Sequence, residues 1–217
     1  MGKTAFIWDL DGTLLDSYEV IVASLYKTYE HYHILMNKGD ILKEVMTTSV
    51  RTFISKTEEE TGISFDVLKD TYSAISEQEK KKIRPIPHAA EILAFLKEKG
   101  IRNYVFTHRG TSTEPVLKNT GLFDFFEEII TGADGFERKP SPEALQYLMA
   151  KHNLSQADTV YVGDRTLDVE CAQNAGISSI LYLPKGSIVE PTGKENCIVA
   201  DLLEIKDWVL DMKWGTA

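Results

Sequence analysis

The chain has 217 residues, of which 43% are hydrophobic and 26% charged, a composition typical of a globular protein with one large domain or a domain with an inserted partner. Its 33 acidic and 24 basic side chains give a net charge of −9, which argues against nucleic acid or an anionic membrane surface as a partner. Two cysteines are too few for a disulfide framework, and neither a secretory signal nor a membrane-spanning run is visible, so we expect a cytoplasmic protein.

The first predicted strand, "AFIW" (residues 5–8), runs directly into two carboxylates, Asp9 and Asp11. The turn that follows contains Gly12 and Thr13. Charged groups beside a buried strand are costly to desolvate unless another group compensates them. Because alternate residues of an extended segment point to opposite sides, Asp9 and Asp11 suit two different tasks rather than one shared grip.

The next part of the chain, residues 16–84, has a helical pattern throughout. Its first helix is marked by apolar residues at three- and four-residue spacing, which form one stripe: Tyr18, Ile21, Val22, Leu25, Tyr26 and Tyr29. Further helices are predicted near 40–58 and 65–82. The segment "RPIP" (84–87) breaks the helical pattern and is predicted to be a hinge or linker.

After this linker, short apolar strands alternate with helical segments. The first helix, "HAAEILAFLKEKG" (88–100), ends at Gly100. The predicted strands are "NYVF" (103–106), "EEIIT" (127–131), "TVYVG" (159–163) and "SSILYL" (178–183). Helices are predicted around 113–120, 142–152 and 167–175.

Alternating strands and helices predict an α/β fold, a doubly wound parallel sheet with a Rossmann-like core. Because the first strand is separated from the others by the helical segment, we expect an inserted helical cap domain. The expected boundaries are 1–15 and 85–217 for the catalytic core and 16–84 for the cap.

Polar side chains follow four of the predicted strands, at the positions where open parallel sheets bind their ligands. In chain order they are Asp9 and Asp11, Thr107 with His108 and Arg109, Arg138 and Lys139, and Asp164 and Asp168. We expect four carboxylates, a hydroxyl and a lysine to converge on one edge of the sheet.

The charges of this set indicate a metal ion and an anionic ligand. Carboxylates packed together repel one another unless a hard cation joins them, and oxygen-only ligands suit Mg²⁺. Lys139 adds a positive charge, Thr107 a hydroxyl, and the turn at Gly12 backbone N–H groups. Such groups suit a phosphoryl-sized anion, and an aspartate beside it can act as a nucleophile and form an aspartyl-phosphate.

Four motifs carry a family resemblance: "DLDGT" (9–13), "VFTH" (105–108), "RKPSPE" (138–143) and "VGDRTLD" (162–168). They occur in the order of the four motifs of the haloacid dehalogenase-like hydrolase superfamily. The helical insert between the first two resembles the small cap of its phosphoglycolate phosphatase and β-phosphoglucomutase branch. The resemblance covers nearly the whole chain.

The resemblance implies roles for the acidic residues. Asp9 is implied as the nucleophile that attacks phosphorus. Asp11 is implied as the general acid that protonates the leaving alkoxide and then as the base that activates water. The implied ligands of Mg²⁺ are Asp9, the backbone carbonyl of Asp11, and Asp164. An aspartate at the second position separates the phosphotransferases of this superfamily from the dehalogenases, so Asp11 argues against dehalogenation.

The resemblance also implies which groups hold the substrate. Thr107 and Lys139 would bind the transferring phosphoryl group, with Gly12 supplying backbone donors nearby. Lys139 would also restrain the nucleophile, and Asp168 would orient Lys139 or a metal-bound water. After Thr107, His108 and Arg109 stand where Asn and a small or basic residue are commoner, so both could contact the leaving group of the substrate, or His108 could hold a loop.

The remaining candidate, Arg51, belongs to the cap segment "TTSVRTF" (47–53), where related caps present specificity residues. It could bind a second anionic group of the substrate or simply be an exposed surface arginine. The departure from the family pattern at His108 and Arg109 leaves the identity of the substrate open.

We therefore expect a Mg²⁺-dependent phosphoric monoester hydrolase, similar to phosphoglycolate phosphatase, that acts on a small phosphorylated metabolite as a monomer or homodimer. The cap would close over the site and exclude water. One alternative is a phosphomutase similar to β-phosphoglucomutase, which would be an isomerase. A second is a regulatory protein that keeps the fold without turnover, and a receiver-like phosphoacceptor domain is disfavoured because the long cap would obstruct protein docking.

Overall fold

The computed structural model describes residues 4–214, with side chains to residue 210. Within it the chain divides into two compact units, which are described separately. One unit combines the segment up to Asp16 with everything from Arg84 onward, and the other is Ser17–Ile83. In the part of the chain that is described, no helix is both long and apolar enough to cross a membrane.

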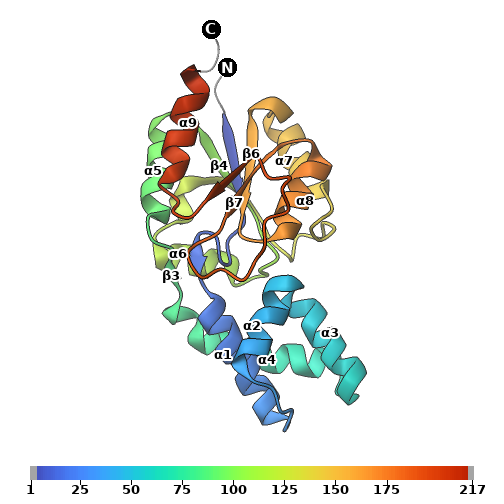
Figure 1. The fold of residues 1–217 in the computed structure, drawn as a ribbon. Helices are drawn as coiled ribbons and strands as arrows, with labels where there is room; N and C mark the ends of the chain where they lie inside the picture. Colours follow the sequence, from blue (N-terminus) through green and yellow to red (C-terminus); the bar gives the residue numbers. More distant parts are fainter. Residues whose placement is uncertain (1–3, 215–217) are drawn as a thin grey trace. The chain divides into compact units, whose positions relative to one another are not determined.

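The first unit is built on a parallel sheet, which confirms the predicted fold class. Among the described residues the sheet has six strands in the order β5-β4-β1-β6-β7-β8, and every neighbouring pair is parallel. Their bounds are β5 Phe126–Ile130, β4 Arg102–Phe106, β1 Ala5–Trp8, β6 Thr159–Gly163, β7 Ser178–Tyr182 and β8 Cys197–Val199. The first strand of the chain therefore lies in the middle of the sheet, between β4 and β6 (Figure 1).

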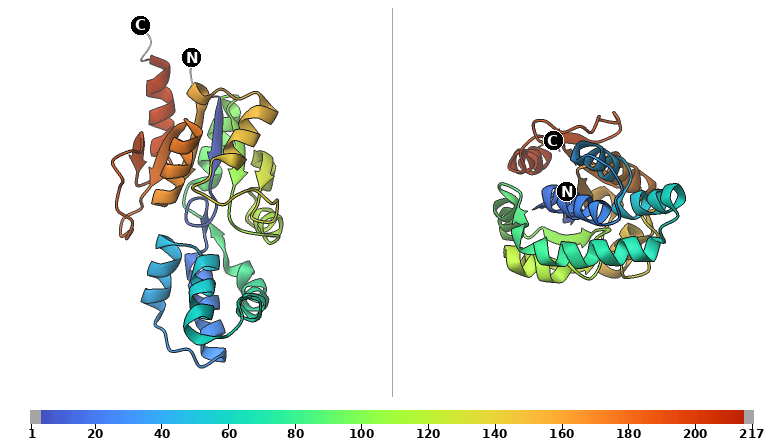
Figure 2. Two further views of the ribbon diagram at one scale, coloured as in Figure 1. Left: turned by 90° about the vertical axis from the view of Figure 1, so that its right-hand side faces the viewer. Right: turned by 90° about the horizontal axis from the view of Figure 1, so that it is seen from below.

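Helices cover both faces of this sheet, as the strand-helix alternation predicts. They are α5 Ala89–Glu98, α6 Thr113–Thr120, α7 Glu143–His152, α8 Thr166–Ala175 and α9 Glu204–Trp214. Helices α7 and α8 lie on one face and α5 and α9 on the other (Figures 1 and 2). Along β1 the side chains alternate accordingly: Ile7 packs with Leu145 and Cys171, whereas Phe6 meets the Trp208 ring edge-on.

The second unit consists of α1 (Tyr18–His31), α2 (Lys38–Thr47), α3 (Val50–Thr61) and α4 (Phe65–Glu79), followed by a short 3₁₀ turn, Lys80–Lys82. Its core is formed by the apolar stripe of α1 together with residues from the other helices. Tyr29 of α1 and Phe53 of α3, for example, make an edge-to-face contact at 5.4 Å between ring centroids.

One helix expected in this unit, 40–58, is interrupted. Helix α2 ends at Thr47, and α3 begins after Ser49, whose side chain accepts a hydrogen bond from the backbone N–H of Thr52. Ser and Thr favour such caps over helix interiors because their hydroxyls compete for backbone groups, so two helices form instead of one.

The chain passes between the units at two strands that pair with each other. β2 (Leu15–Asp16) and β3 (Arg84–Pro85) form an antiparallel ladder, and the N–H of Ile86 donates to the carbonyl of Leu14 at 2.9 Å. The predicted break in the helix at "RPIP" is present, but the segment is also partly a strand, because Arg84 and Pro85 pair with Asp16 and Leu15.

Candidate active site

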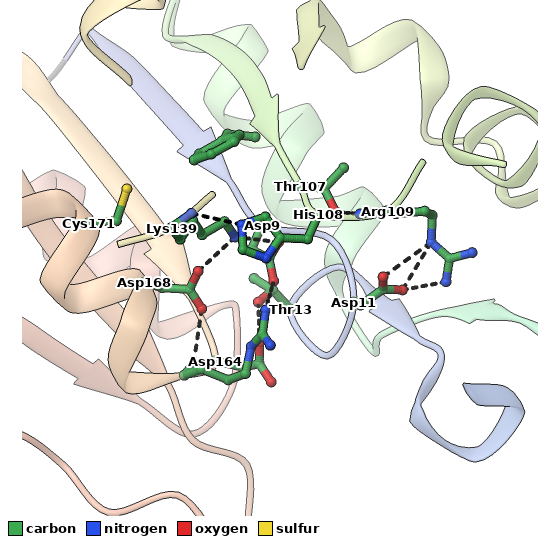
Figure 3. A network of polar contacts seen from close by, with 12 residues as sticks. Asp9, Asp11, Thr13, Thr107, His108, Arg109, Lys139, Asp164, Asp168 and Cys171 are labelled. Carbon is green, nitrogen blue, oxygen red and sulfur yellow. Dashed lines mark hydrogen bonds and ion pairs between the residues drawn. The ribbon is translucent and has the colours of Figure 1, made fainter. Parts of the chain in front are cut away.

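Three neighbouring strands of the core deliver polar residues to one edge of the sheet. The register places Trp8 of β1 opposite Val105 of β4 and Val162 of β6, so these three strands end together. Asp9 follows β1, and its N–H donates to the carbonyl of Val162 at 2.9 Å. Thr107 follows β4 and Asp164 follows β6, and both are buried (Figure 3).

A buried lysine connects two of the carboxylates. Lys139, in the loop between β5 and α7, donates from Nζ to Asp9 Oδ1 at 2.7 Å and to Asp168 Oδ1 at 2.8 Å. All three side chains are at most 1% exposed. The rings of Phe106 and Tyr161 each lie 5.3 Å from the ammonium, so Lys139 is held between two carboxylates and two aromatic faces.

Burial and charge oppose each other at this lysine. Burial alone would lower the pKa of Lys139, but the charges of Asp168 and Asp9 outweigh it and raise the pKa above its usual range. Burial also raises the pKa of Asp9, an effect that the charge of Lys139 counteracts. A cation bound next to Asp9 would favour the ionised form of this carboxyl group, so Asp9 is suited to bind a cation.

Both carboxylate oxygens of Asp168 accept hydrogen bonds. Its Oδ1 accepts from Lys139, and its Oδ2 accepts from the backbone N–H of Arg165 at 3.1 Å, a contact that caps the start of α8. A Cβ on Gly163 would lie only 2.4 Å from the Asp168 side chain, so the last position of β6 requires glycine. Because both oxygens already accept hydrogen bonds, Asp168 is better suited to orienting Lys139 than to binding a ligand itself.

Asp9 and Asp164, with Asp168 beside them, form a group whose oxygens fit a hard metal ion. Each offers an oxygen within 4.8 Å of the others, and all three are buried. Among the described residues, Asp9 Oδ2 has no hydrogen-bond partner, and it lies 3.8 Å from Nη2 of Arg165. Asp164 Oδ1 accepts from the hydroxyl of Thr13 at 3.2 Å. A buried oxygen-only set with one orphaned carboxylate oxygen matches the preference of Mg²⁺.

Asp11 has a different environment from Asp9, although the two are only two residues apart. Its carboxylate faces the guanidinium of Arg109, which follows Thr107 and His108 after β4 (Figure 3). The Arg109 Nε lies 3.1 and 3.2 Å from the two carboxylate oxygens. The two acids therefore have separate partners, as their alternation in sequence predicts.

Three other candidate residues shape the loops around the site. The N–H of Gly12 donates to the carbonyl of Leu15 at 2.9 Å, so this donor is engaged in the turn itself. Thr107 Oγ1 accepts from the backbone N–H of Arg109 at 3.1 Å. His108 Nε2 accepts from the backbone N–H of Lys139 at 2.9 Å, which ties the loop carrying the lysine to the end of β4.

This contact requires a neutral imidazole at His108. Burial lowers the pKa of His108 far below its usual range, and the positive charges of Lys139 and Arg138 lower it further. Arg51 belongs to the helical unit, where it is exposed and lies over the ring of Phe65 at 5.1 Å. Its described contact is thus within that unit.

Residues that were not proposed from the sequence also line the site. The hydroxyl of Thr13 reaches Asp164, Arg165 lies beside Asp9, and the Tyr161 ring flanks Lys139. A basic residue between the two acids of "GDRTLD" is a signal that could have pointed to Arg165. The position of Tyr161 has no comparable signal, because inward-facing aromatic residues are ordinary in a buried strand.

The core is a parallel α/β sheet that gathers carboxylates and a lysine at the carboxyl ends of its strands, the edge at which open sheets of this kind bind their ligands. Residues 6–182 match the family model described as haloacid dehalogenase-like hydrolase. The chain belongs to this family, which confirms the resemblance carried by the four motifs.

Two curated relatives align with about four-fifths of the chain. The pyrophosphatase PpaX of Bacillus velezensis is 30% identical over 176 residues, which cover 80% of each chain. The phosphoglycolate phosphatase of Vibrio parahaemolyticus is 29% identical over 185 residues, which cover 79% of this chain and 80% of that protein.

Solved structures share the fold. A predicted phosphoglycolate phosphatase of Haemophilus somnus superposes with a TM-score of 0.86 at 22% identity, covering 95% of this chain and 97% of the other. CbbY of Rhodobacter sphaeroides, solved in complex with phosphate, gives a TM-score of 0.82 at 18% identity, covering 94% and 96%. At this level of identity the likeness concerns the fold alone.

Proposed function

We propose that this chain is a Mg²⁺-dependent phosphatase that hydrolyses a small phosphorylated metabolite through an aspartyl-phosphate on Asp9. The observation that carries the proposal is the setting of Asp9. Its carboxylate is buried, one oxygen is held by Lys139, and the other has no hydrogen-bond partner among the described residues. A buried carboxylate with an oxygen that accepts no hydrogen bond, and that lies only 3.8 Å from the guanidinium of Arg165, is arranged to bind a cation or attack an electrophile rather than to stabilise the fold.

In the first step, an Asp9 oxygen attacks phosphorus, the bond from phosphorus to the leaving oxygen breaks, and the phosphoryl group becomes attached to Asp9. Lys139 neutralises charge on the transferring group, and Thr107 supplies a hydroxyl at the end of the adjacent strand. Asp168 keeps the ammonium of Lys139 directed at the nucleophile, since it holds Nζ at 2.8 Å.

Asp11 handles the protons in this proposal. It gives a proton to the leaving oxygen in the first step and takes one from the water that hydrolyses the aspartyl-phosphate in the second. Asp11 is suited to this separate task because its carboxylate lies outside the group formed by Asp9, Asp164 and Asp168.

Asp9, Asp164 and the backbone carbonyl of Asp11 are the proposed ligands of Mg²⁺. Bound there, the ion would compensate the negative charge that the carboxylates and the phosphoryl group bring together. Thr13 fixes the orientation of Asp164 through its hydroxyl, and Asp164 is thereby directed into the carboxylate group.

The names of the relatives support a small phosphorylated substrate, since one is a pyrophosphatase and another a phosphoglycolate phosphatase. We propose that the core unit carries the chemistry and that the helical unit, as a cap domain, contributes to selectivity. Arg51 and His108 are the proposed contributors to substrate recognition.

The test is release of inorganic phosphate from a panel of sugar phosphates, nucleotides, phosphoglycolate and pyrophosphate, with and without Mg²⁺. The proposal expects release that depends on Mg²⁺ and is lost in Asp9→Asn. A matched control is Asp16→Asn, which removes an exposed carboxylate from β2. Absence of release from every substrate would contradict a phosphatase, and conversion of a sugar phosphate to its isomer would replace it with a phosphomutase.

A further inference from the structure

Arg109 makes a fork-shaped contact with Asp11 at the catalytic edge of the sheet. Its Nε lies 3.1 and 3.2 Å from the carboxylate oxygens, and its Nη2 lies 2.5 Å from Oδ1 (Figure 3). Only 7% of the Arg109 side chain is exposed, compared with 20% for Asp11. A planar guanidinium in this geometry recognises carboxylates and phosphates through two parallel N–H donors.

The backbone around Arg109 is held from several directions. Its N–H donates to the hydroxyl of Thr107 at 3.1 Å, and its carbonyl accepts from the N–H of Gly132 at 2.8 Å. A Cβ on Gly132 would lie 2.5 Å from the carbonyl oxygen of His108, so glycine is needed for this close approach. The guanidinium is further placed by Ser112, whose Oγ lies 3.3 Å from Nη1. Arg109 is therefore a fixed cation and not a mobile surface arginine.

We propose that Arg109 recognises an anionic group on the leaving portion of the substrate, so that preferred substrates carry a carboxylate or a second phosphate next to the scissile bond. The inference rests on the proposed function, in which Asp11 protonates the leaving oxygen. That oxygen must come within hydrogen-bond distance of the Asp11 carboxyl group. Arg109 is already at that distance from the same carboxyl group, so a substituent one or two bonds from the leaving oxygen is within its reach.

Substrate binding replaces the Asp11 carboxylate at the Arg109 guanidinium with an anionic group of the substrate. The substrate's anionic group takes over the N–H donors that Asp11 occupies, and the Asp11 carboxyl group becomes available to the leaving oxygen. A fixed arginine is also a means of attracting a doubly anionic substrate to a chain whose net charge is −9. A neutral leaving group offers Arg109 no such partner and leaves the contact with Asp11 intact.

The experiment compares substrates that differ in one group. Phosphoglycolate and 2-hydroxyethyl phosphate differ by a carboxylate in place of a hydroxymethyl group. Pyrophosphate is the third substrate and tests a phosphate as the anionic group on the leaving portion. The unmodified protein should have a higher kcat/KM for one or both anionic substrates than for 2-hydroxyethyl phosphate. In Arg109→Gln this preference should fall by about 10- to 100-fold, the range expected for a charge-assisted hydrogen bond. Arg109→Lys should retain part of the preference.

Arg102→Gln is the matched control, because Arg102 begins β4 at the opposite end of the same strand. It should leave the preference unchanged. The ratio of kcat/KM values within one preparation does not depend on how much of a variant is folded, so partial misfolding does not obscure the result.

A loss confined to phosphoglycolate would identify a carboxylate as the recognised group, and a loss confined to pyrophosphate would identify a phosphate. An equal loss on anionic and neutral substrates would overturn the inference, because Arg109 would then act only by positioning Asp11. The absence of any preference in the unmodified protein would overturn it as well. Both results leave the phosphatase itself intact, whereas no turnover of any substrate would defeat the proposed function.

Discussion

The two units of this chain differ in what they bury. The core buries charged groups at one edge of its sheet, among them Asp9, Lys139, Asp164 and Asp168. Among its described residues, the buried polar groups of the helical unit Ser17–Ile83 are hydroxyls, at Ser17, Ser24, Thr28, Tyr29, Ser49 and Thr57. Two of these, Thr28 and Thr57, donate to carbonyls one helical turn earlier.

The buried polar groups of the two units differ in what they cost the stability of the fold. A buried hydroxyl that bonds its own helix costs the fold little. A buried ion pair, in contrast, is at best a weak contribution to stability and is often less favourable than packed apolar residues. The charges at the core edge are therefore best explained by chemistry, and the predictions below compare that edge with ordinary positions elsewhere.

The largest effect is expected for the nucleophile. Asp9→Asn should lower kcat by about 10³-fold or more, because an amide cannot form the acyl phosphate. Phosphate release under saturating substrate and Mg²⁺ measures it. Activity within tenfold of the unmodified protein would show that Asp9 is not the attacking group.

The next effect concerns stability. Lys139→Met leaves the buried carboxylates of Asp9 and Asp168 without their shared cation, and should lower the free energy of unfolding by about 3–5 kcal/mol in the absence of metal. Lys56→Met, which breaks an exposed ion pair with Glu44 in the helical unit, should leave the free energy of unfolding nearly unchanged. Urea denaturation of both variants measures the contrast, and equal effects would remove the distinction between the two units.

A smaller effect is expected at the end of β6. Gly163→Ala places a methyl group 2.4 Å from the Asp168 side chain and should displace it from Lys139, lowering kcat/KM by roughly tenfold. Gly110→Ala is the control, since a Cβ there meets no described atom within 4 Å. The value of kcat/KM is measured for both variants side by side. Full activity in Gly163→Ala would contradict this role of Asp168.

The smallest effect is a pH dependence of stability at His108. Burial lowers the pKa of His108 in the folded protein, whereas the unfolded chain binds a proton at about pH 6.5. Below that pH the unfolded state holds more protons, so stability falls as the pH falls, by at most about 1.4 kcal/mol per pH unit.

The variant His108→Gln should flatten this decline between about pH 7 and pH 5. His31→Gln, at an exposed position of the helical unit, is the matched control and should leave the decline in place. Urea denaturation across this range measures both variants. A decline as steep in His108→Gln as in the unmodified protein would assign the effect to other groups.

Much of the fold could be predicted because its strands are buried apolar runs. β1 and β6, for example, are fully buried on both faces and stand out in the sequence. β8 could not be found in the same way, because it is a three-residue strand at the edge of the sheet and Ile198 in it is 46% exposed. β2 and β3 have two residues each and exist only because they pair.

In the site, too, some contacts could be predicted from the sequence and others could not. Asp9 and Lys139 are 130 positions apart, yet strand topology alone suggests that they lie at one edge. The contact between Arg109 and Asp11, and that between Thr13 and Asp164, could not be derived in this way. They depend on the path of loops and on side-chain rotamers, which residue patterns do not encode at this level.

The measurement that tests the central claim most directly is capture of the covalent intermediate. The protein is mixed with Mg²⁺ and a substrate that it hydrolyses. The reaction is quenched, and the protein is reduced with borohydride and digested for mass spectrometry. An acyl phosphate is reduced to an alcohol, so we predict homoserine at position 9 and an unmodified Asp11, and no homoserine at either position in Asp9→Asn. Rapid turnover with no reduced residue at position 9, or with the modification at Asp11, would contradict the account.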